Sequence, residues 1–197
     1  MRCHFAWALV GWSLLGLVVG VGGAEAASGD ADGTYTVTVT KIEMSRDGGA
    51  TFSTVFSGST AINIASVTAG ATAAGLVSGV ALAPGTYTVV RTTIGSTLQI
   101  KGYLNISGST WYTNGGTDGS AFTVNAGVTN TPGATYATSS FTIPSANLTN
   151  SQTGLSIVVT SGGAGPTVRV AFNTSGVITN SGGTPTIGAP GVTITSS

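Results

Sequence analysis

The 197-residue chain contains one cysteine and one histidine, and only 6 % of its residues are charged. Cys3 and His4 both lie near the start, so residues 27–197 contain neither type. That region therefore has no disulfide and none of the histidine or cysteine needed for Ser-His-Asp or Cys-His catalysis or for most zinc sites. We predict no catalytic residue, no metal site and no cofactor, and we expect that the chain is not an enzyme.

Charge is scarce and balanced, whereas charged residues make up about a quarter of typical soluble domains. A net charge near zero removes the repulsion that keeps monomers apart. It also argues against binding to nucleic acid, which needs a dense basic face, and against electrostatic binding to membranes. We expect Arg91 to pair internally with Glu43 or Asp118, or to donate to loop carbonyls. Beyond residue 26 the charged residues are Lys41, Arg46, Arg91, Lys101 and Arg169 against Asp30, Asp32, Glu43, Asp47 and Asp118.

One acidic motif is a candidate calcium site. Asp30-Ala31-Asp32-Gly33 resembles the opening of a calcium loop, but an EF-hand needs an acid at the twelfth position, and that position is Lys41. The motif is therefore not an EF-hand calcium loop. A weaker surface site and a solvated N-terminal segment remain as alternatives.

The first 26 residues have the pattern of a signal peptide. Arg2 gives a positive start, residues 5–22 are apolar, and Ala24-Glu25-Ala26 has the small-x-small form of a cleavage site. The alternative is a retained membrane anchor, although no basic stop-transfer cluster follows. We predict a secreted protein, extracellular or at the cell surface, with no membrane association after cleavage.

The rest of the chain has the period-two pattern of β-strands. Apolar residues alternate with threonine over residues 35–40, and the pattern then slips, because Ile42 and Met44 are the next apolar positions. A β-bulge near Thr40-Lys41 explains the slip. A hairpin turn is expected at residues 45–49. Strands are predicted at residues 35–44, 51–56, 61–65, 76–82, 86–94, 98–106, 110–113, 121–124, 140–143, 154–160, 167–172 and 192–195.

This pattern predicts an all-β fold, a mainly antiparallel β-sandwich of Ig-like or prealbumin-like topology with a tethered terminal strand. We assign residues 1–26 to the signal peptide and residues 27–180 to the sandwich domain. Residues 181–197 are expected to form a Gly/Ser/Pro linker and a C-terminal strand.

The edges of such a sandwich lack the usual protection. Natural monomers blunt exposed edge strands with lysine, inward charges, proline or bulges, yet beyond residue 26 only Lys41 and Lys101 are lysines. Either loops cover the edges or another subunit pairs with them. A terminal strand could be the donor, although an ordinary intradomain strand is the alternative at both ends. The candidate donor residues are Val192, Thr193, Ile194 and Thr195, or N-terminal Tyr35, Val37 and Val39.

A sequence of three motifs indicates a family. IEMSRDGGATFSTVFSG (42–58) is followed by Ile62-Asn63-Ile64 and then by Pro84-Gly85-Thr86-Tyr87 with Arg91. Over residues 34–106 this order resembles a family of secreted prokaryotic β-sandwich domains of unknown function, with prealbumin-like or carbohydrate-binding-like topology. The resemblance implies a fold and no catalytic residue, and Asn63 stands where that family commonly has an acid. A looser, architectural likeness is to donor-strand-linked extracellular fibre subunits such as pili and biofilm matrix filaments.

One cluster has the composition of a glycan site: Trp111, Tyr112, Asn114 and Asp118. Aromatic faces stack on sugar rings, and amides and carboxylates bind hydroxyls. However, Trp111 and Tyr112 are adjacent in a predicted strand and should point to opposite faces. The alternative is that Trp111 is a core residue.

We therefore expect an exported structural subunit that binds copies of itself and polymerises into an extracellular filament or surface layer by β-strand donation. The alternative is a secreted glycan-binding or adhesion module, with surface glycans as its partner.

Overall fold

The computed structural model describes residues 28–66, 82–161 and 168–196, and this part of the chain is all-β. The predicted signal peptide lies outside it, as does most of the strand expected at residues 76–82. Two short 3₁₀ helices, η1 (Asp118–Ser120) and η2 (Ser145–Asn147), accompany the strands. The strands are β1 (Ala31–Ser45), β2 (Ser53–Asn63), β3 (Gly85–Tyr87), β4 (Val89–Ile106), β5 (Ser109–Thr113), β6 (Phe122–Asn125), β7 (Ser139–Thr142), β8 (Thr149–Gln152), β9 (Ile157–Val159), β10 (Val168–Asn173), β11 (Ile178–Ser181), β12 (Thr184–Ile187) and β13 (Gly191–Ser196).

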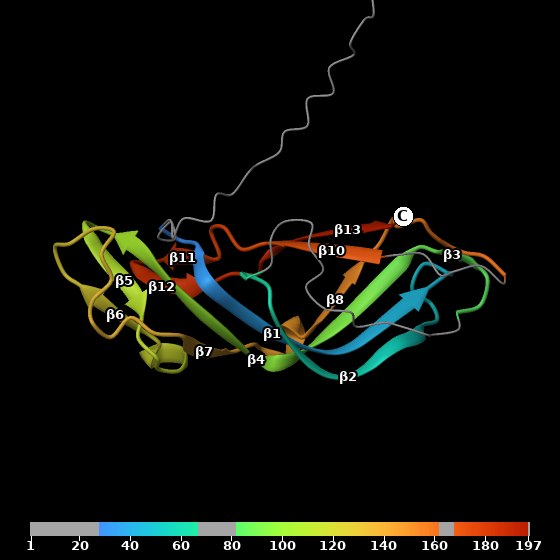
Figure 1. Cartoon of the computed structure of the whole chain (residues 1–197), viewed down its shortest axis with the longest axis horizontal. Helices are drawn as coiled ribbons and strands as arrows, with labels where there is room; N and C mark the ends of the chain where they lie inside the picture. Colours follow the sequence, from blue (N-terminus) through green and yellow to red (C-terminus); the bar gives the residue numbers. More distant parts are fainter. Residues whose placement is uncertain (1–27, 67–81, 162–167, 197) are drawn as a thin grey trace, which may run out of the picture.

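The main sheet has the order β2-β1-β4-β5-β6, with β7 and β8 paired along β4 as well. Every pair of these strands is antiparallel. Figure 1 shows β1 and β4 running side by side through the length of the molecule. The expectation of an all-β, antiparallel fold is confirmed.

The bulge predicted near Thr40-Lys41 is present. Val39 and Lys41 of β1 pair with Ile94 and Thr93 of β4, so Thr40 is an extra residue on β1. This extra residue shifts the alternation of buried and exposed positions along β1, and Met44, which follows the bulge, is buried. The predicted turn at residues 45–49 joins β1 to β2, and its Gly48 and Gly49 have the positive φ angles that such turns require.

A second layer covers part of the main sheet. Two small antiparallel sheets, β10–β13 and β11–β12, lie over β1 and β4 in Figure 1. The larger core cluster lies between the layers, because Val177 and Ile178 from the second layer are buried with residues of β1, β2 and β4. Its buried members are Tyr35, Val37, Val39, Ile62, Ile64, Leu98, Ile100, Val177 and Ile178.

A second core cluster lies where β1, β2 and β4 meet the small β3–β9 sheet. Tyr87 and Ile157 are almost completely buried there, and their backbones pair directly. Arg46, in the turn after β1, donates from Nη1 to the Pro84 carbonyl (2.9 Å), and its guanidinium lies 5.8 Å from the centre of the Tyr87 ring. Two of the sequence motifs, the Gly-Gly turn and Pro84-Gly85-Thr86-Tyr87, therefore contact each other.

The structure differs from the prediction around residue 180. Residues 178–187 form the hairpin β11–β12, with a two-residue Gly182-Gly183 turn. Ile187 packs against the larger core cluster. The first part of the segment expected to be a linker is thus a strand, because Ile187 has apolar surface to bury and Gly-Gly supplies the turn.

The buried Tyr35 gives a prediction about alkaline stability. Burial raises the pKa of its hydroxyl to about 12. A folded pKa above the unfolded value near 10 contributes stability that is complete below pH 10 and is lost as the pH rises toward 12. We expect the wild type to lose about 1.4 kcal/mol more than Tyr35→Phe between pH 9 and pH 11 in urea unfolding. Equal losses in both proteins would contradict this assignment.

Candidate functional site

The C-terminal strand β13 has a single strand partner in the described residues. It pairs antiparallel with β10 over six residue pairs, from Val168 with Ser196 to Asn173 with Gly191. The two strands form a sheet of their own. Among the described residues β13 forms this one ladder, and neither β13 nor β10 pairs with a further strand on its other edge.

A short irregular segment connects β12 to β13. Gly188 donates its N–H to the Val177 carbonyl (2.7 Å), and its own carbonyl accepts the Tyr35 hydroxyl (3.1 Å). Ala189 and Pro190 follow without regular structure, and β13 begins at Gly191. Only these two residues separate a well-anchored glycine from the strand.

The other candidate donor, the N-terminal strand, is in the middle of the main sheet. β1 pairs with β2 on one side and β4 on the other, and Tyr35, Val37 and Val39 are all buried. Donating this strand to a neighbour would separate β2 from β4 and open the larger core. The structure thus makes β13 the simpler strand to exchange.

Among the described residues, the long edge strand β2 has few of the features that block pairing with another strand. Its eleven residues, STVFSGSTAIN, include no charge and no proline, and β1 is its only strand partner among the described residues. Two register shifts interrupt its ladder with β1. Val39 and Lys41 pair with Thr60 and Ser57, and Ile42 and Glu43 pair with Phe56 and Thr54, so that at each shift β2 has one residue more than β1.

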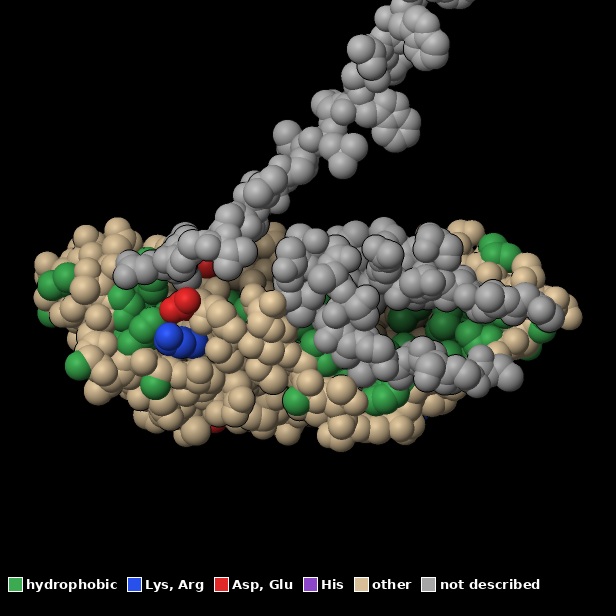
Figure 2. Space-filling model, viewed as in Figure 1, with side chains coloured by type: hydrophobic (Ala, Val, Ile, Leu, Met, Phe, Trp, Pro, Cys, Tyr) green, Lys and Arg blue, Asp and Glu red, His purple; other side chains and the backbone are tan. Residues whose placement is uncertain are grey.

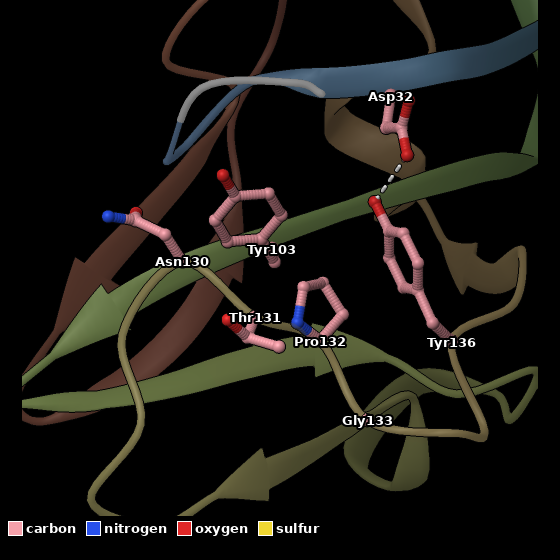
Figure 3. A pocket seen from close by; sticks show the side chains of 7 residues that line it. All are labelled: Asp32, Tyr103, Asn130, Thr131, Pro132, Gly133 and Tyr136. Atoms are coloured by element: carbon pink, nitrogen blue, oxygen red, sulfur yellow. Dashed lines mark hydrogen bonds between the residues drawn. The ribbon is translucent and has the colours of Figure 1, made fainter. Parts of the chain in front are cut away.

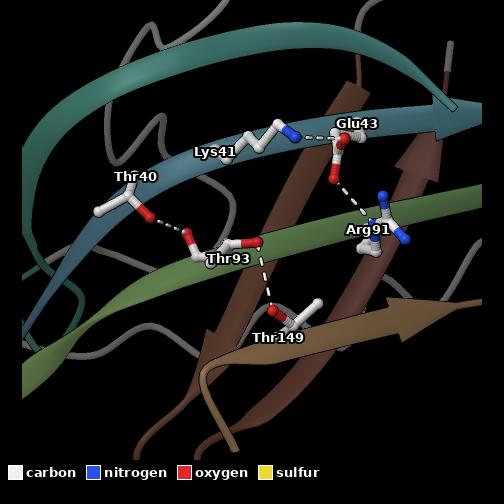
Figure 4. A network of polar contacts seen from close by, with 6 residues as sticks. All are labelled: Thr40, Lys41, Glu43, Arg91, Thr93 and Thr149. Atoms are coloured by element: carbon white, nitrogen blue, oxygen red, sulfur yellow. Dashed lines mark hydrogen bonds and ion pairs between the residues drawn. The ribbon is translucent and has the colours of Figure 1, made fainter. Parts of the chain in front are cut away.

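The predicted ion pair of Arg91 is with Glu43, as Figure 4 shows. Arg91 Nε donates to Glu43 Oε2 (2.8 Å), and Lys41 Nζ lies 2.6 Å from Oε1. Glu43 is only 5 % exposed, and the Arg91 guanidinium also lies 3.6 Å from the centre of the Phe52 ring. Hydrogen bonds from Arg91 and then Lys41 lower the pKa of Glu43. This cluster joins β1 to β4 and is structural.

The four residues of the predicted glycan cluster do not share one surface. Tyr112 is buried, and Trp111, on the opposite face of β5, is half-buried between its cross-strand partners Leu104 and Val124. The side chains of the polar pair support the local backbone. Asn114 Oδ1 accepts the Gly116 N–H (2.9 Å), and Asp118 accepts the N–H and hydroxyl of Thr142 (2.6 and 3.0 Å).

The acids of the calcium-like motif bind protein groups. Asp30 Oδ1 accepts the Gly176 N–H (2.8 Å), and Asp32 Oδ2 accepts the Tyr136 hydroxyl (2.8 Å). Among the described residues, no group of three or more His, Cys, Asp or Glu could hold a metal ion. The same part of the chain includes no helix with the length and apolarity to cross a bilayer.

Comparison with known proteins adds no relative: no family model matches the chain, and neither a curated protein nor a solved structure matches it.

The sequence analysis did not predict the β11–β12 hairpin or the hydrogen bonds of Gly188 that precede the terminal strand. Residues 178–187 were read as the domain's end and a linker, although Gly-Gly between two short polar segments is a hairpin signal. Nothing in the sequence pointed to the bonds of Gly188, because they depend on Val177 and on Tyr35, far away along the chain.

Proposed function

We propose that this chain is an exported structural subunit that polymerises into an extracellular filament or surface layer by exchanging β13 between subunits. The observation that carries the proposal is the attachment of β13, one strand partner and a two-residue connection after Gly188. A β13 that leaves its own β10 can take the same register on the β10 of a neighbour. The backbone ladder is then the same in both states.

Exchange replaces the internal β10–β13 ladder by an identical one between subunits, so it neither adds nor removes backbone hydrogen bonds. The six residues of β13 extend about 20 Å. Because the exchanged ladder replaces an identical internal one, the free-energy cost of assembly has two main sources. These are the lost translational and rotational freedom of the subunits and the straightening of the Ala189-Pro190 connection. Each subunit both gives and receives a strand, so the interface is head-to-tail and generates a chain unless the rotation closes a ring.

The surface of the molecule also supports association. On the face shown in Figure 2, uncharged polar side chains and backbone dominate, and charged side chains are few. With no net charge, subunits that approach each other meet little repulsion. The exposed threonines and serines of strands such as β2 keep an assembled fibre wettable.

Cysteine cross-linking tests the exchange directly, because residues 27–197 have no cysteine of their own. Ala171 of β10 and Thr193 of β13 are direct partners in the register, and paired antiparallel residues have Cα atoms close enough for a disulfide. We mix exported Ala171→Cys with exported Thr193→Cys under assembly conditions and oxidise them. A covalent heterodimer on a non-reducing gel is the expected product.

The matched control mixes Ala171→Cys with Thr184→Cys, which lies in β12 and has no register partner in β10. We expect several-fold more heterodimer from the paired variants than from this control. Equal yields from both mixtures, in samples that contain filaments, would overturn strand exchange between β10 and β13.

A further inference from the structure

The chain contains sequons, the Asn-x-Ser/Thr tripeptides at which exported proteins accept N-linked glycans. Such a tripeptide arises easily in a sequence rich in threonine and serine, so its structural setting decides whether it can be modified. An acceptor asparagine has to lie at the surface with its side-chain amide free, and the hydroxyl two residues later has to be accessible as well. The three sequons are Asn105-Ile106-Ser107, Asn147-Leu148-Thr149 and Asn173-Thr174-Ser175.

The first sequon belongs to a hydrogen-bonded contact between β4 and the loop that joins β6 to β7. Asn105 is partly buried, and its Oδ1 accepts the Asn130 N–H (3.0 Å) and the Thr110 hydroxyl (3.1 Å). Its Nδ2 donates to Asn130 Oδ1. The same loop forms one wall of a pocket of about 280 Å³, with Asp32 and Tyr103 on the strands opposite (Figure 3). A sugar on Asn105 Nδ2 would separate β4 from this loop.

The second sequon lies in a surface turn between β7 and β8. Asn147 is the last residue of the 3₁₀ helix η2; it is exposed, and its side chain bonds no described residue. Thr149, two residues later, is also exposed and begins β8. Its hydroxyl lies 3.3 Å from the hydroxyl of Thr93, in an exposed contact. The amide and the hydroxyl that the modification needs are both accessible.

The third sequon forms a turn at the end of β10. Asn173 is the last residue of that strand and is exposed, and its Oδ1 accepts the Ser175 N–H (3.0 Å). This Asx turn holds Ser175 beside the side-chain amide and leaves Nδ2 without a bond to any described residue. Ser175 is exposed as well. The turn therefore presents the acceptor asparagine together with the serine of its sequon.

Both accessible sequons adjoin strands that have one strand partner. Among the described residues, β8 pairs only with β4, and β10 pairs only with β13. The residues of β8, Thr-Asn-Ser-Gln, include no charge that would block pairing with another chain. A glycan next to such a strand covers its edge. It also adds hydration to a chain of which only 6 % of the residues are charged.

We propose that Asn147 and Asn173 carry N-linked glycans in the exported protein and that Asn105 carries none. The donor is an oligosaccharide linked to a lipid phosphate, which the exporting cell supplies with the transferase. A bond forms between the asparagine Nδ2 and C1 of the first sugar as the bond from C1 to the phosphate breaks. The amide loses a proton, and the lipid phosphate is released. The modification requires export, as the proposed function does, but it does not require strand exchange.

Peptide mapping of the protein exported by its own host tests the proposal. Trypsin should release residues 170–197, with Asn173 in their only sequon, and residues 102–169, with the other two sequons. Chymotrypsin, which cuts after aromatic residues, then separates Asn105 from Asn147. We expect mass spectrometry to find a glycan on Asn147 and on Asn173 and an unmodified Asn105. A glycan missing from either of the first two, or present on Asn105, would overturn the proposal. If such a protein still cross-links through β13, the proposed function stands without the glycans.

A substitution outside the acceptor itself locates the glycan on residues 170–197. Ser175→Ala removes the hydroxyl of the sequon but keeps Asn173 and the backbone N–H that forms its Asx turn. We expect complete loss of the glycan, so that the peptide returns to the mass of the bare sequence. A glycan that remains after this change would contradict N-linked transfer to Asn173.

Asn180 is the matched control within the same peptide. It is exposed, and its Oδ1 also accepts a backbone N–H, from Gly183 (2.9 Å), but Gly182 stands where a sequon has its hydroxyl. Asn180→Gln should therefore leave the glycan in place. Loss of the glycan in this variant would assign it to the wrong asparagine.

Discussion

A subunit that ends at Pro190 is expected to fold and to form no filament. β13 makes one strand ladder, with β10, and every described member of the larger core cluster precedes residue 188. The truncation therefore removes the exchangeable strand and keeps every described member of that core. A cut at Asn180 would be a poorer test, because it also removes β12 and the packed side chain of Ile187. Electron microscopy of the full-length and truncated proteins gives the readout.

The truncated subunit should accept the missing strand in trans. A peptide of residues 188–197 is expected to bind it in the register of β13, and a scrambled peptide of the same composition is the control. Fluorescence anisotropy of a labelled peptide measures the binding. Full-length subunits should compete, because they carry the same strand. Filaments from the truncated protein would show that β13 is not the donor and would remove the central support for the proposed function.

Much of the fold could be predicted because strands with one buried face carry a period-two signal. Residues 35–39 alternate strictly, and the slip before Ile42 located the bulge at Thr40 that the ladder with β4 contains. The turn at residues 45–49 was equally visible, since its glycines are needed for positive φ angles.

The strands that the sequence analysis did not predict lack this period-two pattern. β8 (Thr149–Gln152) is polar and almost entirely exposed, so no apolar residue marks it, and it exists because it extends the edge of β4. Residues 86–94 and 98–106 were read as two strands, yet β4 runs unbroken from Val89 to Ile106 through Gly95 and Ser96. An uncharged glycine and serine look like a turn in sequence. Neither has a ladder partner, but the pairs at Ile94 and Thr97 on either side keep the chain in one strand.

The candidate sites were less predictable because they depend on long-range contacts. The pairing of Arg91 with Glu43 was foreseen as one of several options, since both lie in strands. The pocket lined by Asp32, Tyr103 and Tyr136 was not, because these residues become neighbours only when β1, β4 and the β6–β7 loop meet. The opposite orientation of Trp111 and Tyr112 could be predicted, because they are adjacent in one strand, β5.

Glu43→Gln is expected to be the most destabilising polar substitution among those considered. The side chain is 5 % exposed and forms ion pairs with Arg91 and Lys41 at 2.8 and 2.6 Å. Removing one partner of a buried ion pair leaves the other charge without compensation. Arg91 and Lys41 are themselves partly exposed. We therefore expect the free energy of unfolding to fall by about 3 kcal/mol, which is a small loss for a broken buried ion pair, in urea unfolding at pH 7.

The size of this loss should depend on pH in a defined direction. The pKa of Glu43 is lowered from its ordinary 4.5, first by Arg91 and then by Lys41. A lowered folded pKa contributes stability that is present above the unfolded value and lost as the pH falls through the folded one. The difference between wild type and Glu43→Gln should therefore be constant from pH 6 to 8 and shrink below about pH 4.5. Asp47, whose pKa the Ser45 hydroxyl also lowers, is common to both proteins and cancels.

The control for the Glu43 experiment is the more exposed pair of Asp32 and Lys101, whose atoms are 3.6 Å apart. Both side chains keep about a third of their surface in water, so Asp32→Asn should cost less than about 1 kcal/mol. A loss for Glu43→Gln as small as this, or one that stays constant down to pH 3, would mean that the carboxylate contributes packing alone. A large loss of stability that decreases at acidic pH would instead show that the charge of Glu43 stabilises the contact between β1 and β4. In a chain with so few ionisable groups, that charge then serves to hold β1 against β4.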